Sequence, residues 1–124
     1  RGALALRINN SSDVAGLSSD AFGNRHAVRW RSAMNWAVED LGTLGGCCSE
    51  GYGINNFGDV VGVSNVSRRR GLQHAFLSLA GAVTMLDLGT LRGDSSARDI
   101  NDFGYAVGSG STGRSVHALL WMLP

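Results

Sequence analysis

Short apolar stretches separated by turn residues run along the whole chain. In the middle of the sequence they fall at residues 51–55, 60–64, 74–79 and 83–91, with a turn at residues 56–58. None of them shows 3.6-residue spacing over a length that a helix needs, while their β-branched content and their Gly, Asn and Asp borders are typical of strands. The pattern therefore predicts four strands in about 46 residues.

Three phrases recur along the chain in the same order. An Ile-Asn pair begins at residues 8, 54 and 100, a His-Ala pair begins at residues 26, 74 and 117, and "DLGTL" begins at residues 40 and 87. A period of this length indicates a repeat architecture in which each unit packs on its neighbours. We therefore expect residues 1–124 to form a single repeat domain, with units at about 1–46, 47–93 and 94–124.

Four antiparallel strands per unit predict an all-β fold of propeller-blade-like units. The "DLGTL" strand occurs only twice, so eleven strands are expected, as two complete units and one that lacks its last strand. Closed propellers need at least about four blades. Three explanations of this count remain open: the sequence is an excerpt of a longer repeat protein, copies associate into a ring or filament, or three sheets form a small open stack. In each case the terminal sheets carry apolar faces and unpaired edges, where another chain can pair.

Turn residues and glycines mark fixed positions within the repeat. Asx and Gly chemistry predicts tight hairpin turns; their residues are Asn9, Asn55, Asn101, Gly58 and Gly104. The first unit has Ser12 in place of this glycine, where we expect slight strain or a different turn.

Glycines also recur inside the second strand, at Gly16, Gly62 and Gly108. They are expected to admit a neighbouring sheet or a bulky side chain. Trp30 and Trp121 are the candidate fillers, and Ser78 at the equivalent position predicts one thinner layer between sheets.

Composition and charge exclude several classes of protein. The chain is 44% hydrophobic with 18 Gly and a formal net charge of +1, which is unlike a disordered or collagen-like chain. Near-neutral charge argues against nucleic acid as a partner, and no apolar run approaches the roughly 20 residues of a membrane helix. The chain carries no nucleophile elbow or phosphate-binding loop, and Glu39 and Glu50 are not repeated. We therefore expect neither an enzyme nor a cofactor.

Two kinds of side chain are candidates for chemistry. Cys47 and Cys48 are adjacent and are the only cysteines, so they predict a vicinal disulfide or crosslinks to another chain more than a zinc site. The alternative is that they are simply two small residues of a loop, without a chemical role. The three histidines occupy one equivalent position, and a structural role is expected for them, with the aspartates of "DLGTL" as partners. These residues are His26, His74, His117, Asp40 and Asp87.

The longest loop between strands carries Arg68, Arg69 and Arg70. Such a run is typical of a solvated loop, and its alternative use is contact with an anionic partner. Asn10 and Asn65 each begin an Asn-x-Ser sequon, a pattern found on surface loops.

The phrases "GINNFGDVVG", "HAFL" and "DLGTLRGDSSARDIN" together resemble the HAF family of extracellular repeats. The resemblance covers nearly the whole chain, with Val28 and Leu119 in place of Phe76, Ser11-Ser12 in the first turn, and Arg92 in place of Gly45 as departures. It implies a secreted or surface-exposed, propeller-like repeat protein of bacteria or archaea with no catalytic residues.

Repeats and resemblance together predict an extracellular structural or self-assembling module, whose partners are further repeats or other copies. The alternative is a propeller domain that binds polysaccharide or a surface protein. Such a domain needs aromatic side chains on its loops, where the chain offers Phe22, Phe57 and Phe103.

Overall fold

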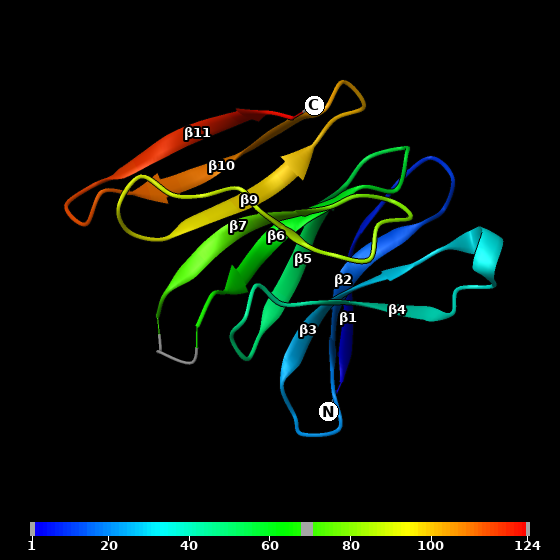
Figure 1. Cartoon of the computed structure of the whole chain (residues 1–124). Coiled ribbons are helices and arrows are strands. Elements are labelled where there is room, and N and C mark those ends of the chain that lie inside the picture. Colours follow the sequence, from blue (N-terminus) through cyan, green and yellow to red (C-terminus); the bar gives the residue numbers. More distant parts are fainter. Residues whose placement is uncertain (1, 68–70, 124) are drawn as a thin grey trace.

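A computed structural model describes residues 2–67 and 71–123, which form eleven strands in three antiparallel sheets (Figure 1). The first sheet contains β1 (Ala3–Ile8), β2 (Val14–Ser19), β3 (Arg25–Trp30) and β4 (Val38–Gly42), with a 3₁₀ turn at Ser32–Met34. The second contains β5 (Ser49–Ile54), β6 (Val60–Asn65), β7 (Gln73–Ser78) and β8 (Leu86–Asp87). The third contains β9 (Ser95–Ile100), β10 (Tyr105–Ser111) and β11 (Val116–Met122). The predicted all-β class and the predicted eleven strands are confirmed.

The last strand of the second unit is shorter than predicted. Residues 83–91 were expected to form one strand, but β8 contains only Leu86 and Asp87. Gly89, two residues after this strand, takes a positive φ of 79°, and the Thr90 hydroxyl donates to the Gly93 carbonyl. Thr43 makes the same bond to Gly46 at 2.9 Å in the first unit. "DLGTL" is therefore the end of a strand followed by the turn that leads to the next sheet.

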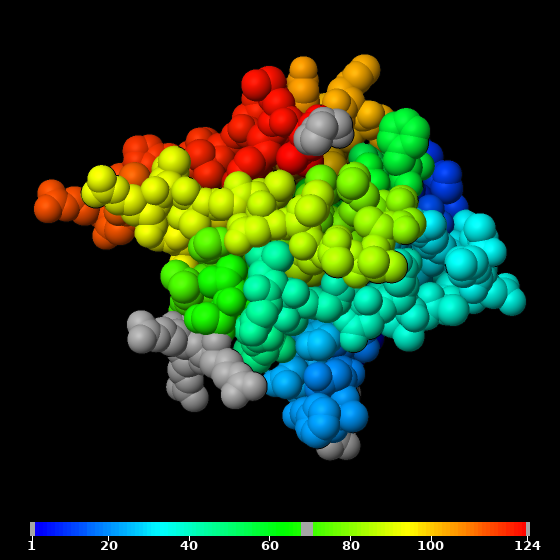
Figure 2. All heavy atoms as spheres, in the orientation of Figure 1, coloured from blue at the N-terminus to red at the C-terminus, as the bar shows by residue number. Residues whose placement is uncertain are grey.

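The three sheets stack in chain order and remain separate, since no described strand joins one sheet to another (Figures 1 and 2). β5 lies against β2 and β3, and β9 lies against β6 and β7. We call the side of a sheet that covers the next sheet its rear face, and the side covered by the preceding sheet its front face. The stack is open at both ends, with a free front face on the first sheet and a free rear face on the third.

Two apolar layers hold the stack together. In the first layer, the rear face of sheet one packs on the front face of sheet two; its buried residues are Ala15, Ala27, Ile54, Val60 and Phe76. In the second layer, the rear face of sheet two packs on the front face of sheet three; its buried residues are Val61, Ala75, Leu77, Ala97, Ile100 and Ala106. Burial of each large apolar side chain contributes about 2 kcal/mol. Because the second sheet packs on both faces, its central strand β6 is nearly continuously apolar.

A β-bulge recurs in the first strand of every sheet. The register shifts at Leu6, Tyr52 and Arg98, which leaves each of them as the extra residue against the second strand. A Cβ at Gly62, opposite the bulge, would lie within 1.9 Å of the Glu50 carbonyl oxygen, and Gly16 and Gly108 are equally crowded. The glycines of the second strand thus admit the backbone of their own sheet, and Gly62 also admits the Phe76 ring, which would lie 2.9 Å from such a Cβ. The expectation that Trp30 and Trp121 fill this space was wrong.

Candidate functional site: asparagine turns and open sheet faces

Each unit turns between its first two strands around an asparagine. The Asn55 Oδ1 atom accepts the backbone N–H groups of Phe57 at 3.0 Å and Asp59 at 2.9 Å, and Gly58 N donates to the Asn55 carbonyl. Asn9 and Asn101 make the same bonds in their own turns. The side chain therefore closes the turn from within, as an Asx motif does.

The first turn is the same turn with a less suitable residue. Ser12 occupies the glycine position with φ 66°, while Gly58 and Gly104 have φ 87° and 83°. A non-glycine residue in this region is strained. The expected strain is confirmed, and the turn type is unchanged because Ser12 N still donates to the Asn9 carbonyl.

The same asparagines link successive sheets. Asn9 Nδ2 donates to the Asn55 carbonyl at 2.9 Å, and Asn55 Nδ2 donates to the Asn101 carbonyl at 3.1 Å. The following residues add a second rung, because Asn10 N donates to Asn56 Oδ1 and Asn56 N donates to Asp102 Oδ1. We call this row the asparagine ladder. Every inter-sheet bond in it runs from donor to acceptor in chain order.

The histidines pair within their own sheets. His26 Nδ1 lies 3.0 Å from Asp40 Oδ2, and His74 Nδ1 lies 2.9 Å from Asp87 Oδ2. His117 instead has its Nε2 atom 3.1 Å from the Ser115 hydroxyl. Each aspartate also accepts a backbone N–H from the turn that follows, so these pairs join the third strand to the fourth. Among the described residues, no group of three His, Cys, Asp or Glu side chains is placed to hold a metal ion.

Asp20 adds a carboxylate at the other end of the His26 ring, with its Oδ2 atom 3.7 Å from Nε2. Burial raises the pKa of Asp20, but the backbone N–H groups of Asn24 and Phe22 and the charge of His26 outweigh it. The net effect lowers the pKa of this carboxyl group.

The adjacent cysteines are joined to each other in the loop between the first two sheets, with their Cα atoms 3.7 Å apart. Cys48 also accepts the backbone N–H of Asn65 through its carbonyl, at 2.9 Å. Of the two arrangements that the sequence left open, the structure contains the disulfide within the chain. Asn65 lies at the end of β6 and Asn10 lies on an exposed turn. The predicted anion contact at Arg68, Arg69 and Arg70 falls outside the described residues.

A buried charge that sequence reasoning missed lies between the first two sheets. The Arg29 side chain is fully buried, donates to the Gly58 carbonyl at 2.7 Å and to the Ser78 carbonyl at 3.3 Å, and binds both oxygens of Glu39. Hydrogen bonding to Arg29 lowers the pKa of Glu39 against an opposing effect of burial, and the charges of Arg29 and Arg31 lower it further.

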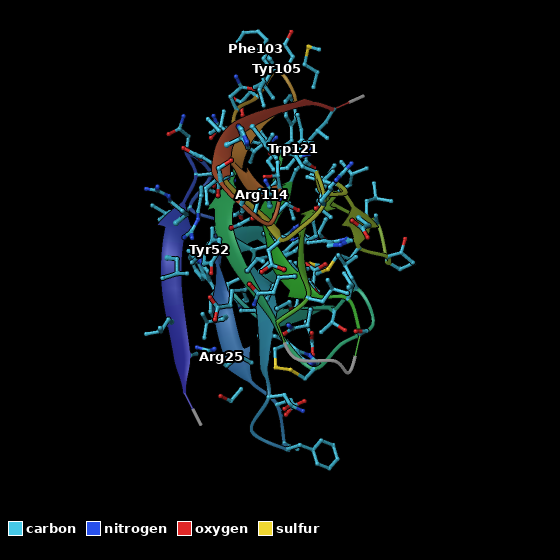
Figure 3. All side chains as sticks on the ribbon, turned by 90° about the vertical axis from the view of Figure 1, so that its left-hand side faces the viewer. Arg25, Tyr52, Phe103, Tyr105, Arg114 and Trp121 are labelled. Atoms are coloured by element: carbon cyan, nitrogen blue, oxygen red, sulfur yellow. A yellow bond between two sulfur atoms is a disulfide. The ribbon has the colours of Figure 1, made fainter. Side chains whose placement is uncertain are left out.

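This arginine explains the missing tryptophan of the middle unit. Arg29 takes the position of Leu77 on the rear face, and Ser78 takes the position of Trp121 on the front face. In the second layer, Trp121 packs on the apolar cluster and donates its Nε1–H to the Leu88 carbonyl at 3.2 Å (Figure 3). The guanidinium therefore replaces a tryptophan ring, and the predicted thinner layer is filled from the opposite sheet. The sequence carried a signal for this contact: Arg29 stands where the other units have leucine, and Ser78 stands where they have tryptophan.

The bulge residues of the second and third sheets meet near a small polar pocket. The Arg98 guanidinium lies 4.5 Å from the centre of the Tyr52 ring, and the Tyr52 hydroxyl donates to Glu50 at 2.5 Å. Arg25 completes the group with an ion pair to Glu50 at 3.2 Å (Figure 3). Burial, followed by the hydrogen bond to Glu50 and its charge, raises the pKa of Tyr52 to about 12. These groups satisfy one another beside a cavity of about 150 Å³.

Both ends of the stack expose apolar side chains. The front face of sheet one carries a shallow hollow of about 300 Å³ that is lined by Ala3, Ala5, Val14, Trp30 and Trp36. Ile8 is exposed on the same face, since it pairs with Val14. At the other end, Val107, Ala118 and Leu120 are exposed on the rear face of sheet three. Exposed apolar surface of this kind marks sites of association.

Helices long and apolar enough to span a membrane are absent from the part of the chain that the structure describes. No family model, no curated protein and no solved structure matches this chain.

Proposed function

We propose that this chain is an extracellular structural module of propeller-blade-like repeats that assembles through the faces of its terminal sheets. The observation that carries the proposal is the pair of apolar faces left open at the two ends of the stack. Repeat proteins need their terminal faces covered, either by polar capping residues or by a partner. Here Ile8 and Leu120 stand exposed where a capping unit would place polar side chains.

The titratable groups support an architectural role. His26 binds Asp40 across β3 and β4, and Arg29 binds Glu39 as well as two carbonyls of the second sheet, so these groups hold strands or sheets together. The Cys47–Cys48 disulfide supports an oxidising setting outside the cytosol. The resemblance to HAF repeats points to the same location.

Sedimentation velocity over a concentration series tests this proposal. We expect the apparent mass to rise above the 13.0 kDa of one chain as the concentration increases. A mass that stays at one chain at the highest soluble concentration would contradict assembly through the terminal faces.

One observation favours binding of a polysaccharide as a second candidate function. Phe57 and Phe103 occupy the same position in successive turns, and both rings are largely exposed. Figure 3 shows the Phe103 ring at one end of the molecule. Exposed aromatic rings are suited to stacking on sugar rings. Affinity electrophoresis in dextran or alginate gels tests this role, with the Phe57→Ala/Phe103→Ala variant compared against Val83→Ala at another exposed position. Retardation that only the double variant loses would support it, and unretarded native chain would exclude these two polymers.

A further inference from the structure

We infer that the partner is a second copy of this chain, which docks head to tail so that the rear face of its third sheet covers the front face of the first sheet. This inference rests on the proposed function and names the partner and the pairing. It extends the two internal layers by a third layer of the same kind.

The open faces carry the residues of an internal layer. The second layer is built from Val61, Ala75, Leu77, Ala97, Ile100 and Ala106. The strand registers show which residues of the open faces are equivalent to these six. In the same order they are Val107, Ala118 and Leu120 on the rear face of sheet three, and Ala5, Ile8 and Val14 on the front face of sheet one. Only the last position differs in residue type. A rear face of sheet three therefore offers the front face of sheet one nearly the same apolar surface that sheet two offers sheet three.

The bulky residues of the open faces also match this pairing. In the second layer a leucine on the rear face accompanies a tryptophan on the front face, namely Leu77 and Trp121. In the first layer an arginine accompanies a serine. The open ends present Leu120 on the rear face and Trp30 on the front face, which is again the leucine and tryptophan combination. Each internal layer contains one of these two combinations. Docking of the two open faces would bring Leu120 and Trp30 together, which completes a leucine and tryptophan combination in the new layer.

The asparagine ladder gives the contact a direction. Within residues 2–67 and 71–123, Asn101 Nδ2 donates to no group, although Asn9 and Asn55 donate to the next sheet. At the other end, Asn10 Oδ1 accepts no hydrogen bond from a described residue, although Asn56 and Asp102 accept from the preceding sheet. The third sheet thus ends with donors and the first begins with acceptors. Head-to-tail docking joins Asn101 to the Asn9 carbonyl and Asp102 N to Asn10 Oδ1.

Pairing of two like faces lacks this complementarity. Two front faces would bring acceptor ends together, and two rear faces would bring donor ends together. A heterologous contact between different faces repeats until the rotation closes a ring or extends a filament. Either assembly contains the same pair of faces.

Two charge variants test the pairing, because each blocks one face only. Ile8→Asp blocks the front face and Leu120→Asp blocks the rear face, and both side chains are exposed in the single chain. Val83→Asp, at an exposed loop position, is the matched control. A buried unpaired charge should raise the dissociation constant on the order of 100-fold, while the thermal midpoint of each variant stays near that of the native chain.

We expect each blocked variant alone to sediment as a single chain, and their equimolar mixture to form a heterodimer through the two intact faces. The Val83→Asp control should assemble like the native chain. Self-association of Ile8→Asp or of Leu120→Asp would overturn the inference in favour of like faces, and would leave the proposed function standing. A native chain that never assembles would overturn both.

The ladder offers a second readout. Asn101→Asp keeps the Oδ1 atom that closes the turn, but it replaces the Nδ2 donor with a charged carboxylate oxygen that would face the Asn9 carbonyl of the next copy. It should therefore weaken assembly by at least about 5-fold, with little effect on the stability of the single chain. Asn55→Asp makes the same change inside the stack and should instead lower the stability of the chain. An assembly constant unaffected by Asn101→Asp would contradict the proposed register.

Discussion

The middle sheet and the terminal sheets use the same residues in different surroundings. Leu77 on the rear face of the middle sheet is 2% exposed, and Leu120 at the same position of the third sheet is 58% exposed. Ile54 on the front face of the middle sheet is 7% exposed, and Ile8 of the first sheet is 66% exposed. The chain therefore places core residues at positions that only a further sheet would bury.

This difference shows that the burial of a side chain depends on the neighbouring sheet and not only on its position within the repeat. The middle sheet has neighbours on both faces, so its apolar residues contribute to the stability of the chain. The same residues at the ends contribute little to that stability and become available for association.

The leucine pair gives the largest expected contrast. Leu77→Ala should lower the free energy of unfolding by about 3 kcal/mol, because it removes a buried side chain and leaves a cavity. Leu120→Ala should change it by about 0.5 kcal/mol or less in dilute solution, because the side chain is exposed there. Urea unfolding at low protein concentration measures both. Equal losses would show that the rear face of the third sheet is already covered in the single chain.

The arginine and serine of the first layer can be replaced by the leucine and tryptophan of the second. Arg29→Leu should cost about 2 kcal/mol, since it removes the hydrogen bonds to the Gly58 and Ser78 carbonyls and to Glu39. Ser78→Trp alone should also destabilise the chain, because its ring meets the buried guanidinium. The double variant reproduces the leucine and tryptophan of the second layer and should be more stable than the sum of the single changes indicates. A thermal double-mutant cycle measures this coupling, and strict additivity would refute the exchange.

The Arg29–Glu39 pair also makes the stability of the first layer depend on pH. The pKa of Glu39 is lowered in the folded chain, so its contribution is full above the ordinary value of 4.5 and is lost as the pH falls through the folded value. Glu39→Gln should therefore cost about 1 kcal/mol at neutral pH, a modest amount because the carboxylate is partly exposed. The difference from the native chain should shrink in acid. Chemical denaturation between pH 2 and 7 tests this, and a constant difference would rule out the carboxylate charge as its source.

The smallest expected effect concerns the first turn. Ser12→Gly removes the strain of a left-handed serine and should stabilise the chain by about 0.5 kcal/mol, partly offset by the greater freedom of glycine when unfolded. Gly58→Ser is the reverse change in the middle unit and should destabilise it. Thermal midpoints of the two variants that move in the same direction would contradict the equivalence of these turns.

The local pattern gave the number of strands and the turns because their signals lie within a few residues, although it made the last strand of the second unit too long. The repeat gave the His–Asp pairs, whose members are 13 or 14 residues apart. The asparagine turns, the strand number and the His26–Asp40 and His74–Asp87 pairs follow from such patterns. The bulge was missed, although its glycines were visible, because it depends on the register between two strands. Arg29 was missed because its burial depends on Ser78, which lies on another sheet.

Methyl NMR spectroscopy of the native chain over a concentration series tests the central claim most directly. We expect the methyl signals of Ile8 and Leu120 to shift together as the concentration rises, while those of Ile54 and Leu77 stay in place. Unchanged signals at both end positions, or a shift at only one of them, would contradict head-to-tail assembly through the open faces.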